Sequence, residues 1–77
     1  MEIIQNTNEI TVKTKSDDLI TIRKTNVLGA LVYTVIDGGY VGCFNTAAEA
    51  LDVVVHSSTL QKHPEDVIKF WLFLNGK

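Results

Sequence analysis

The stretch from residue 36 to residue 56, IDGGYVGCFNTAAEALDVVVH, decides the fold class because it holds a turn, a strand and a helix in succession. The two glycines after Asp37 favour a tight hairpin turn, since glycine adopts positive φ angles without steric cost. The segments on either side, YTVI and YVGCF, are rich in β-branched and aromatic residues, which suit strands. The stretch therefore predicts two antiparallel strands that lead directly into a helix.

The helix has a marked beginning. Thr46 is followed three residues later by Glu49, the spacing of a capping box, in which the hydroxyl accepts from a first-turn N–H and the carboxylate reaches back to the N–H of the capping residue. Apolar residues then recur at spacings of three and four: Ala47, Ala50, Leu51, Val54 and Val55. We expect one side of this helix to be buried.

Upstream, residues 9–24 read EITVKTKSDDLITIRK and alternate apolar with polar residues on either side of KSDD. This period of two predicts an antiparallel hairpin with one face exposed to solvent, and KSDD is typical of a turn. Asn26 and Gly29 indicate a bend before the apolar run ALVYTVI, which we interpret as a central strand.

The tail, residues 63–77, reads HPEDVIKFWLFLNGK. Pro64 followed by two carboxylates suits the first turn of a helix, and Asn75 with Gly76 suits its end. VIKFWLFL is also rich in β formers, so a fifth strand is the alternative; the well-marked start favours the helix. On a helical wheel, Phe73 lies toward the polar side, and a broad apolar arc contains Val67, Ile68, Phe70, Trp71, Leu72 and Leu74.

These elements predict an α+β fold: a four-stranded antiparallel β-meander followed by two α-helices packed on one face. The 77 residues suit a single α+β domain, 1–77, with a thin hydrophobic core. The formal net charge of −2 provides no general attraction to nucleic acids or anionic membranes. Cys43 has no second cysteine to pair with, and MEIIQNTNEI lacks the pattern of a signal peptide, so we expect a cytoplasmic protein.

The residues that carry chemistry do not form a catalytic or metal-binding pattern. Asp17, Asp18 and Asp37 suit predicted turns, and Glu65 with Asp66 suit a helix dipole. His56, His63 and Cys43 lack the spacing of a zinc site. We interpret Cys43 as a small buried hydrophobe, and the glycines of DGGYVG do not match a nucleotide-binding motif. We therefore expect no enzyme activity, no metal and no cofactor.

Two sets of residues are candidates for binding. Basic residues of the first hairpin, with tyrosines that could share a sheet face with some of them, resemble the surfaces that hold single-stranded nucleic acids: Lys13, Lys15, Arg23, Lys24, Tyr33 and Tyr40. The tail concentrates Phe70, Trp71 and Phe73, which suit either a core or a protein interface.

The segment ALVYTVIDGGYVGCFNTAAEALDVVV, residues 30–55, resembles small phage-encoded proteins in which a hairpin and a strand ending in an aromatic residue precede a helix that opens T-x-x-E-A-L. Some type I anti-CRISPR proteins, with four strands and two helices, look like this, as do certain phage inhibitors of host RNA polymerase. The similarity covers about a third of the chain. It implies a non-catalytic inhibitor that acts in the host cytoplasm by covering a surface of a larger partner.

The first hypothesis is therefore a protein-binding inhibitor or regulator of a larger protein or protein complex. Its contacts are expected from the exposed sheet face or from the tail: Lys13, Thr21, Arg23, Tyr33, Tyr40, Trp71 and Phe73. In a variant of this hypothesis, Asp17, Asp18 and Asp37 imitate phosphates toward the partner. The alternative is a small nucleic-acid-binding or antitoxin-like transcription-regulating module, and a homodimer with the tail at its seam remains open.

Overall fold

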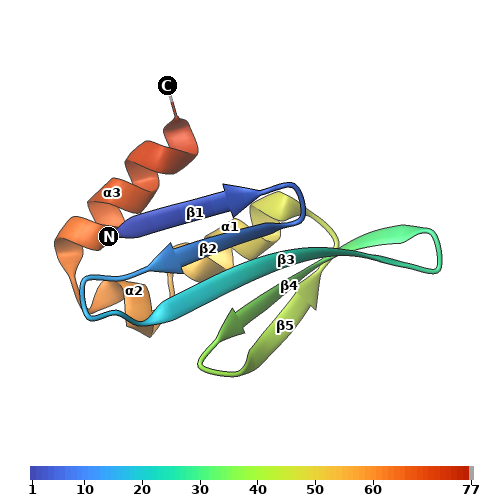
Figure 1. Ribbon diagram of the computed structural model, residues 1–77, viewed down its shortest axis with the longest axis horizontal. Helices are drawn as coiled ribbons and strands as arrows, with labels where there is room; N and C mark the ends of the chain where they lie inside the picture. Colours follow the sequence, from blue (N-terminus) through green and yellow to red (C-terminus); the bar gives the residue numbers. More distant parts are fainter. Residues whose placement is uncertain (77) are drawn as a thin grey trace.

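The computed structural model describes residues 1–76, which form a five-stranded antiparallel sheet and three helices (Figure 1). The strands lie in the order β1-β2-β3-β4-β5: β1 (Glu2–Asn6), β2 (Glu9–Lys13), β3 (Leu19–Val27), β4 (Ala30–Asp37) and β5 (Tyr40–Phe44). The helices follow as α1 (Ala47–Val55), α2 (Ser58–Gln61) and α3 (Pro64–Asn75). The predicted α+β class is confirmed.

The predicted numbers of four strands and two helices are wrong by one each. The additional strand, β1, pairs along its length with β2 at the edge of the sheet. Ile3 is the residue of this strand that packs against the core. One inward apolar residue is too little to produce a recognisable alternation in the sequence. The additional helix, α2, is a single turn whose start is capped by Ser57, which accepts from the N–H of Thr59 at 3.1 Å.

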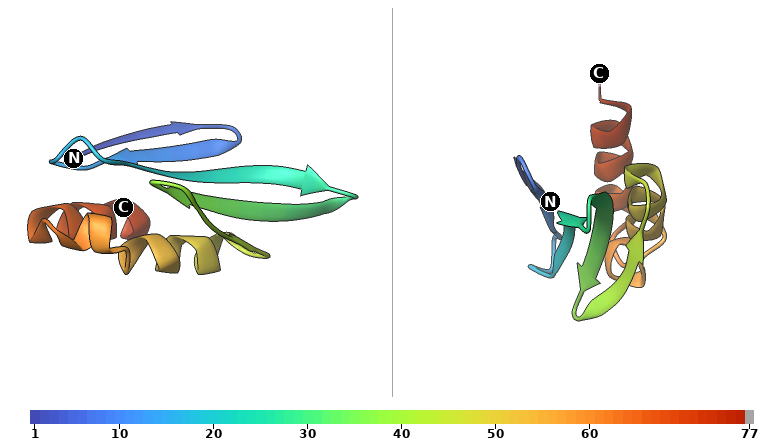
Figure 2. Two further views of the ribbon diagram at one scale, coloured as in Figure 1. Left: turned by 90° about the horizontal axis from the view of Figure 1, so that it is seen from below. Right: turned by 90° about the vertical axis from the view of Figure 1, so that its right-hand side faces the viewer.

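All three helices lie on one side of the sheet, as Figure 2 shows. Alternate strand residues point toward them, because successive side chains of a strand face opposite ways. The buried core combines these sheet residues with residues of the helices: Val12, Ile20, Ile22, Val35, Ala50, Val54, Val55, Leu60 and Phe70. The opposite side of the sheet has no helix over it within residues 1–76.

Helix α1 begins as predicted, with one difference in its cap. The Thr46 hydroxyl oxygen accepts from the N–H of Glu49 at 3.2 Å. The Glu49 carboxylate accepts in turn from the Thr46 hydroxyl, at 3.1 Å, instead of from the Thr46 N–H. The helix buries Ala50, Val54 and Val55 and leaves Ala47 exposed.

The tail is a helix, as favoured in the sequence analysis. The face that it turns toward the core differs from the predicted apolar arc. The inward residues are Asp66 and Phe70, and the Phe73 ring stacks on that of Phe70 with centroids 6.0 Å apart. Phe73 is therefore half-buried against the core and not on the polar side. Three residues assigned to the apolar arc are exposed instead: Ile68, Trp71 and Leu72. Gly76, at φ 57°, ends the helix in the left-handed conformation.

Candidate binding surfaces

The helix-free side of the sheet, which we call the open face, presents side chains from all five strands. The strand registers align one central row across it: Ile4, Thr11, Thr21, Ile36 and Tyr40. A second row lies beside it: Asn6, Glu9, Arg23, Thr34 and Cys43. Tyr40 is 71% exposed and Ile4 is 52% exposed. The central row is thus an uncharged strip of β-branched and aromatic side chains in contact with solvent.

Four of the five predicted sheet contacts lie on this face: Lys13, Thr21, Arg23 and Tyr40. Tyr33 does not, because it stands opposite Lys24 and Phe44 in register and packs against the core on the helix side. The expectation that Tyr33 lies on the exposed sheet face together with Tyr40 is therefore corrected. Tyr33 shares a face with Lys24, whereas Tyr40 shares one with Lys13 and Arg23.

Three of the four basic residues of the first hairpin lie beside carboxylates. Arg23 Nε lies 3.0 Å from a Glu9 oxygen, and Lys13 Nζ lies 3.7 Å from an Asp17 oxygen. Lys15 Nζ lies 3.1 Å from a Glu65 oxygen and lowers the pKa of that carboxyl group. Such pairs leave little positive potential to attract a phosphate backbone.

Cys43 is exposed, which corrects the interpretation of this residue as a buried hydrophobe. Its Sγ lies 3.4 Å from the Thr34 hydroxyl and 3.3 Å from the Tyr40 hydroxyl, all on the open face. These hydrogen bonds, first from Thr34 and then from Tyr40, lower the pKa of the Cys43 thiol. The same contact with Cys43 raises the pKa of Tyr40.

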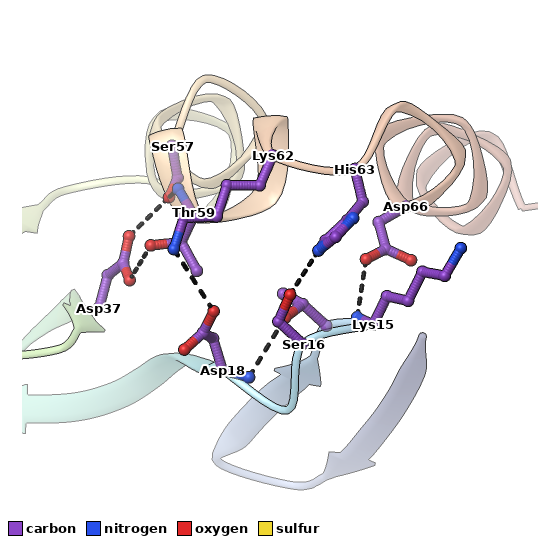
Figure 3. A network of polar contacts seen from close by, with 10 residues as sticks. Lys15, Ser16, Asp18, Asp37, Ser57, Thr59, Lys62, His63 and Asp66 are labelled. Atoms are coloured by element: carbon purple, nitrogen blue, oxygen red, sulfur yellow. Dashed lines mark hydrogen bonds and ion pairs between the residues drawn. The ribbon is translucent and has the colours of Figure 1, made fainter.

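Two of the three aspartates considered as phosphate mimics, Asp18 and Asp37, take part in a polar network between the hairpin turns and the helices (Figure 3). Asp37 accepts from the hydroxyls of Ser57, at 2.5 Å, and Thr59, at 2.8 Å. Asp18 lies 3.8 Å from Lys62 Nζ, and Asp17 lies near Lys13. Asp18 and Asp37 therefore hold the hairpin turns against α2 and have a role within the fold. Asp17 differs, because its side chain is 81% exposed and its ion pair with Lys13 stays within the first hairpin.

The same network brings together a hydroxyl and an imidazole that the sequence did not pair, Ser16 Oγ and His63 Nε2 (Figure 3). A nucleophilic serine also needs free donors to stabilise an oxyanion. Three neighbouring N–H groups already have acceptors within the fold, because those of Asp17 and Asp18 donate to Thr14 and that of Lys15 donates to Asp66. The pair ties the β2–β3 turn to the start of α3.

Helix α3 presents a smaller apolar strip to solvent. Ile68, Trp71 and Leu72 are exposed by 60%, 49% and 68%, at helical spacings that place them side by side. Of the two tail residues expected to contact a partner, Trp71 belongs to this strip. Phe73 belongs mainly to the core.

Two further features were missed in the sequence. Leu28, in the β3–β4 turn, is fully exposed, with φ 52°. A groove of about 180 Å³ lies between the β1–β2 turn, the middle of β3 and β4, and the start of α1. The exposed Leu28 could have been recognised in the sequence, because a leucine is unusual in a bend between Asn26 and Gly29. The groove has no sequence signal, because it joins residues from five elements.

Within residues 1–76, no group of three or more histidine, cysteine, aspartate or glutamate side chains is arranged to hold a metal ion. The helices in the same range are all too short or too polar to cross a membrane. In comparisons with known proteins, no family model, no curated protein and no solved structure matches this chain.

Proposed function

We propose that the protein is a non-catalytic binding module that docks its open face against a larger protein and inhibits or regulates that partner by covering its surface. The observation that carries the proposal is the uncharged central row of the open face, which ends in the exposed Tyr40. Tyrosine is enriched at the centres of protein interfaces, whereas charged residues are depleted there.

The charges around this row also favour a protein partner. Glu2 and Lys13 stand opposite each other in register, as do Glu9 and Arg23, so the acidic and basic groups of the face balance. Paired charges at the rim of an interface contribute specificity and do not require an oppositely charged partner. A surface of this kind fits another protein better than a nucleic acid. The proposal includes action in the host cytoplasm, in the manner of the phage-encoded inhibitors that residues 30–55 resemble.

The test places a photo-crosslinking amino acid at position 40 and, as a matched control, at position 71 on α3, in cells of the natural host. We expect position 40 to capture one protein. That protein, once purified, should bind the wild-type chain, and Tyr40→Ala should weaken binding about 30-fold, as expected for a tyrosine that anchors an interface. Thr21→Arg, which places a bulky charge in the central row, should abolish binding, whereas Trp71→Ala should not.

Other results would overturn the proposal. Binding that withstands Thr21→Arg but is lost on Trp71→Ala would move the interface to α3. Salt-dependent binding to an oligonucleotide, lost when Lys13→Ala is combined with Arg23→Ala, would identify the nucleic-acid-binding module instead. Circular dichroism of each variant would establish that the fold is intact.

A further inference from the structure

The β3–β4 hairpin extends beyond the rest of the sheet as a two-stranded finger, residues 25–32 (Figure 1). The register of β2 with β3 ends at Arg23, and that of β5 with β4 ends at Tyr33. In Figure 2 the finger projects past α1 and past the β1–β2 turn. From its base at Lys24 and Tyr33 to its tip at Leu28, four residues of extended chain span about 13 Å.

The tip of the finger is held in a conformation that leucine rarely adopts. Leu28 and Gly29 have φ angles of 52° and 86°, which is the pattern of a type I′ turn. Asparagine before glycine is the favoured pair for such a turn, and a leucine there is strained. Leu28 is also 103% exposed, so its side chain contributes no packing within the chain. A residue that is both strained and fully exposed indicates a role outside the folded monomer.

The groove lies at the base of the same finger, on the helix side of the sheet. Its floor and one wall are formed by apolar side chains together with Lys24 and the Tyr33 ring: Ile10, Ile22, Ala47 and Leu51. The remaining wall is polar and comes from the β1–β2 turn and the strand ends beside it: Gln5, Asn6, Thr7, Asn8 and Glu9. Its volume is about 180 Å³, and a cavity of about 150 Å³ in another protein is large enough to bind benzene. A leucine side chain therefore fits.

We propose that two copies of this chain form a two-fold dimer in which each finger lies antiparallel to the other and places Leu28 in the groove of its partner. When two identical fingers lie antiparallel, the tip of each one reaches the base of the other, which is where the groove lies. One two-fold axis therefore satisfies both contacts at once, as an isologous interface requires. This contact is separate from the open face and does not depend on the function proposed above.

The middle of the finger suits this arrangement. The axis passes near the Asn26–Leu31 pair, which is midway between base and tip in register. Leu31 is 49% exposed and lies on the same side of the ribbon as Tyr33 and the groove, so it meets its own copy at the axis. Residues 25–32 contain no charged side chain, and the two fingers therefore do not repel each other.

The first experiment measures the mass of the purified chain by sedimentation equilibrium over a concentration series. Wild-type protein should approach twice its monomer mass of 8.5 kDa as concentration rises. Leu28→Asn should remain monomeric and yet unfold at a higher temperature, because Asn-Gly suits the turn. Val27→Thr, which changes the other side of the finger at nearly constant shape, is the matched control and should dimerise like wild type.

A second variant tests the groove without touching the finger. Ala47 is exposed at the groove wall, so Ala47→Trp should fill the groove and abolish dimerisation while leaving the fold intact. In a Cys43→Ser background, Leu28→Cys with Ala47→Cys should produce a disulfide-linked dimer on oxidation. A wild-type chain that is monomeric at every concentration would overturn the proposal, as would a dimer that persists in both Leu28→Asn and Ala47→Trp.

Discussion

The carboxylate of Asp66 accepts a hydrogen bond from the backbone N–H of Lys15 at 2.8 Å, although the two residues lie 51 positions apart. The Asp66 side chain is 1% exposed, and its second oxygen lies 3.7 Å from the amino group of Met1. This contact joins the β2–β3 turn to the first turn of α3. Asp66 is therefore a tertiary link as well as a carboxylate near the positive end of a helix dipole.

Asp66→Ala should destabilise the protein by about 2–3 kcal/mol, because it removes the acceptor of the Lys15 N–H and the carboxylate that forms an ion pair with the Met1 amino group. Urea denaturation followed by circular dichroism measures this loss. Glu65→Ala is the matched control, since Glu65 is the neighbouring carboxylate and is exposed. Equal stability of the two variants would contradict the tertiary role of Asp66.

The two adjacent aromatic residues of α3 should differ sharply in their contribution to stability. Phe70 is fully buried, and Phe70→Ala should cost about 3–5 kcal/mol, much of the stability of a domain of this size. Trp71 is half-exposed, and Trp71→Ala should cost less than about 1 kcal/mol. Thermal unfolding is best followed by circular dichroism, since Trp71 is the single tryptophan. A large loss from Trp71→Ala would show that the outer strip of α3 is covered.

Stability should decline on the acid side through Glu65. Its pKa is lowered in the folded protein by the hydrogen bond and charge of Lys15, so its contribution is present above the ordinary glutamate value of 4.5. That contribution is lost as pH falls through the lowered pKa. The difference in Tm between wild type and Glu65→Gln should therefore be present at neutral pH and vanish in acid. A constant difference across this range would show that the ion pair is not its source.

Cys43 should react with iodoacetamide more readily near neutral pH than an ordinary exposed cysteine, because its thiol pKa is lowered by Thr34 and Tyr40. Combining Thr34→Val with Tyr40→Phe removes both hydroxyls and should shift the alkylation profile to higher pH. The two proteins should react alike well above both pKa values, where each thiol is fully ionised. Identical profiles throughout would contradict the hydrogen bonds to the thiol.

The sequence predicted correctly those elements whose ends are marked by capping or turn residues. The Thr46 cap, the turn at Gly38 and Gly39 and the Pro64 start all depend on residues within a few positions of one another, so they can be recognised in the sequence. Strand β1 was missed because its stability comes from pairing with β2 and not from its own pattern. The rotation of α3 was missed because it is set by contacts of Asp66 and Phe70 with distant elements.

The sequence by itself therefore determined the α+β class, the meander of the central strands and the ends of the two longer helices, because short-range propensities and turn geometry decide these features. The tertiary structure decided which residues share a face. Tyr33 lies on the helix side, Cys43 and Tyr40 lie on the open face, and the groove lies at the base of the finger that carries Leu28. These positions depend on strand register and helix packing, where a shift of one residue turns a side chain to the opposite face.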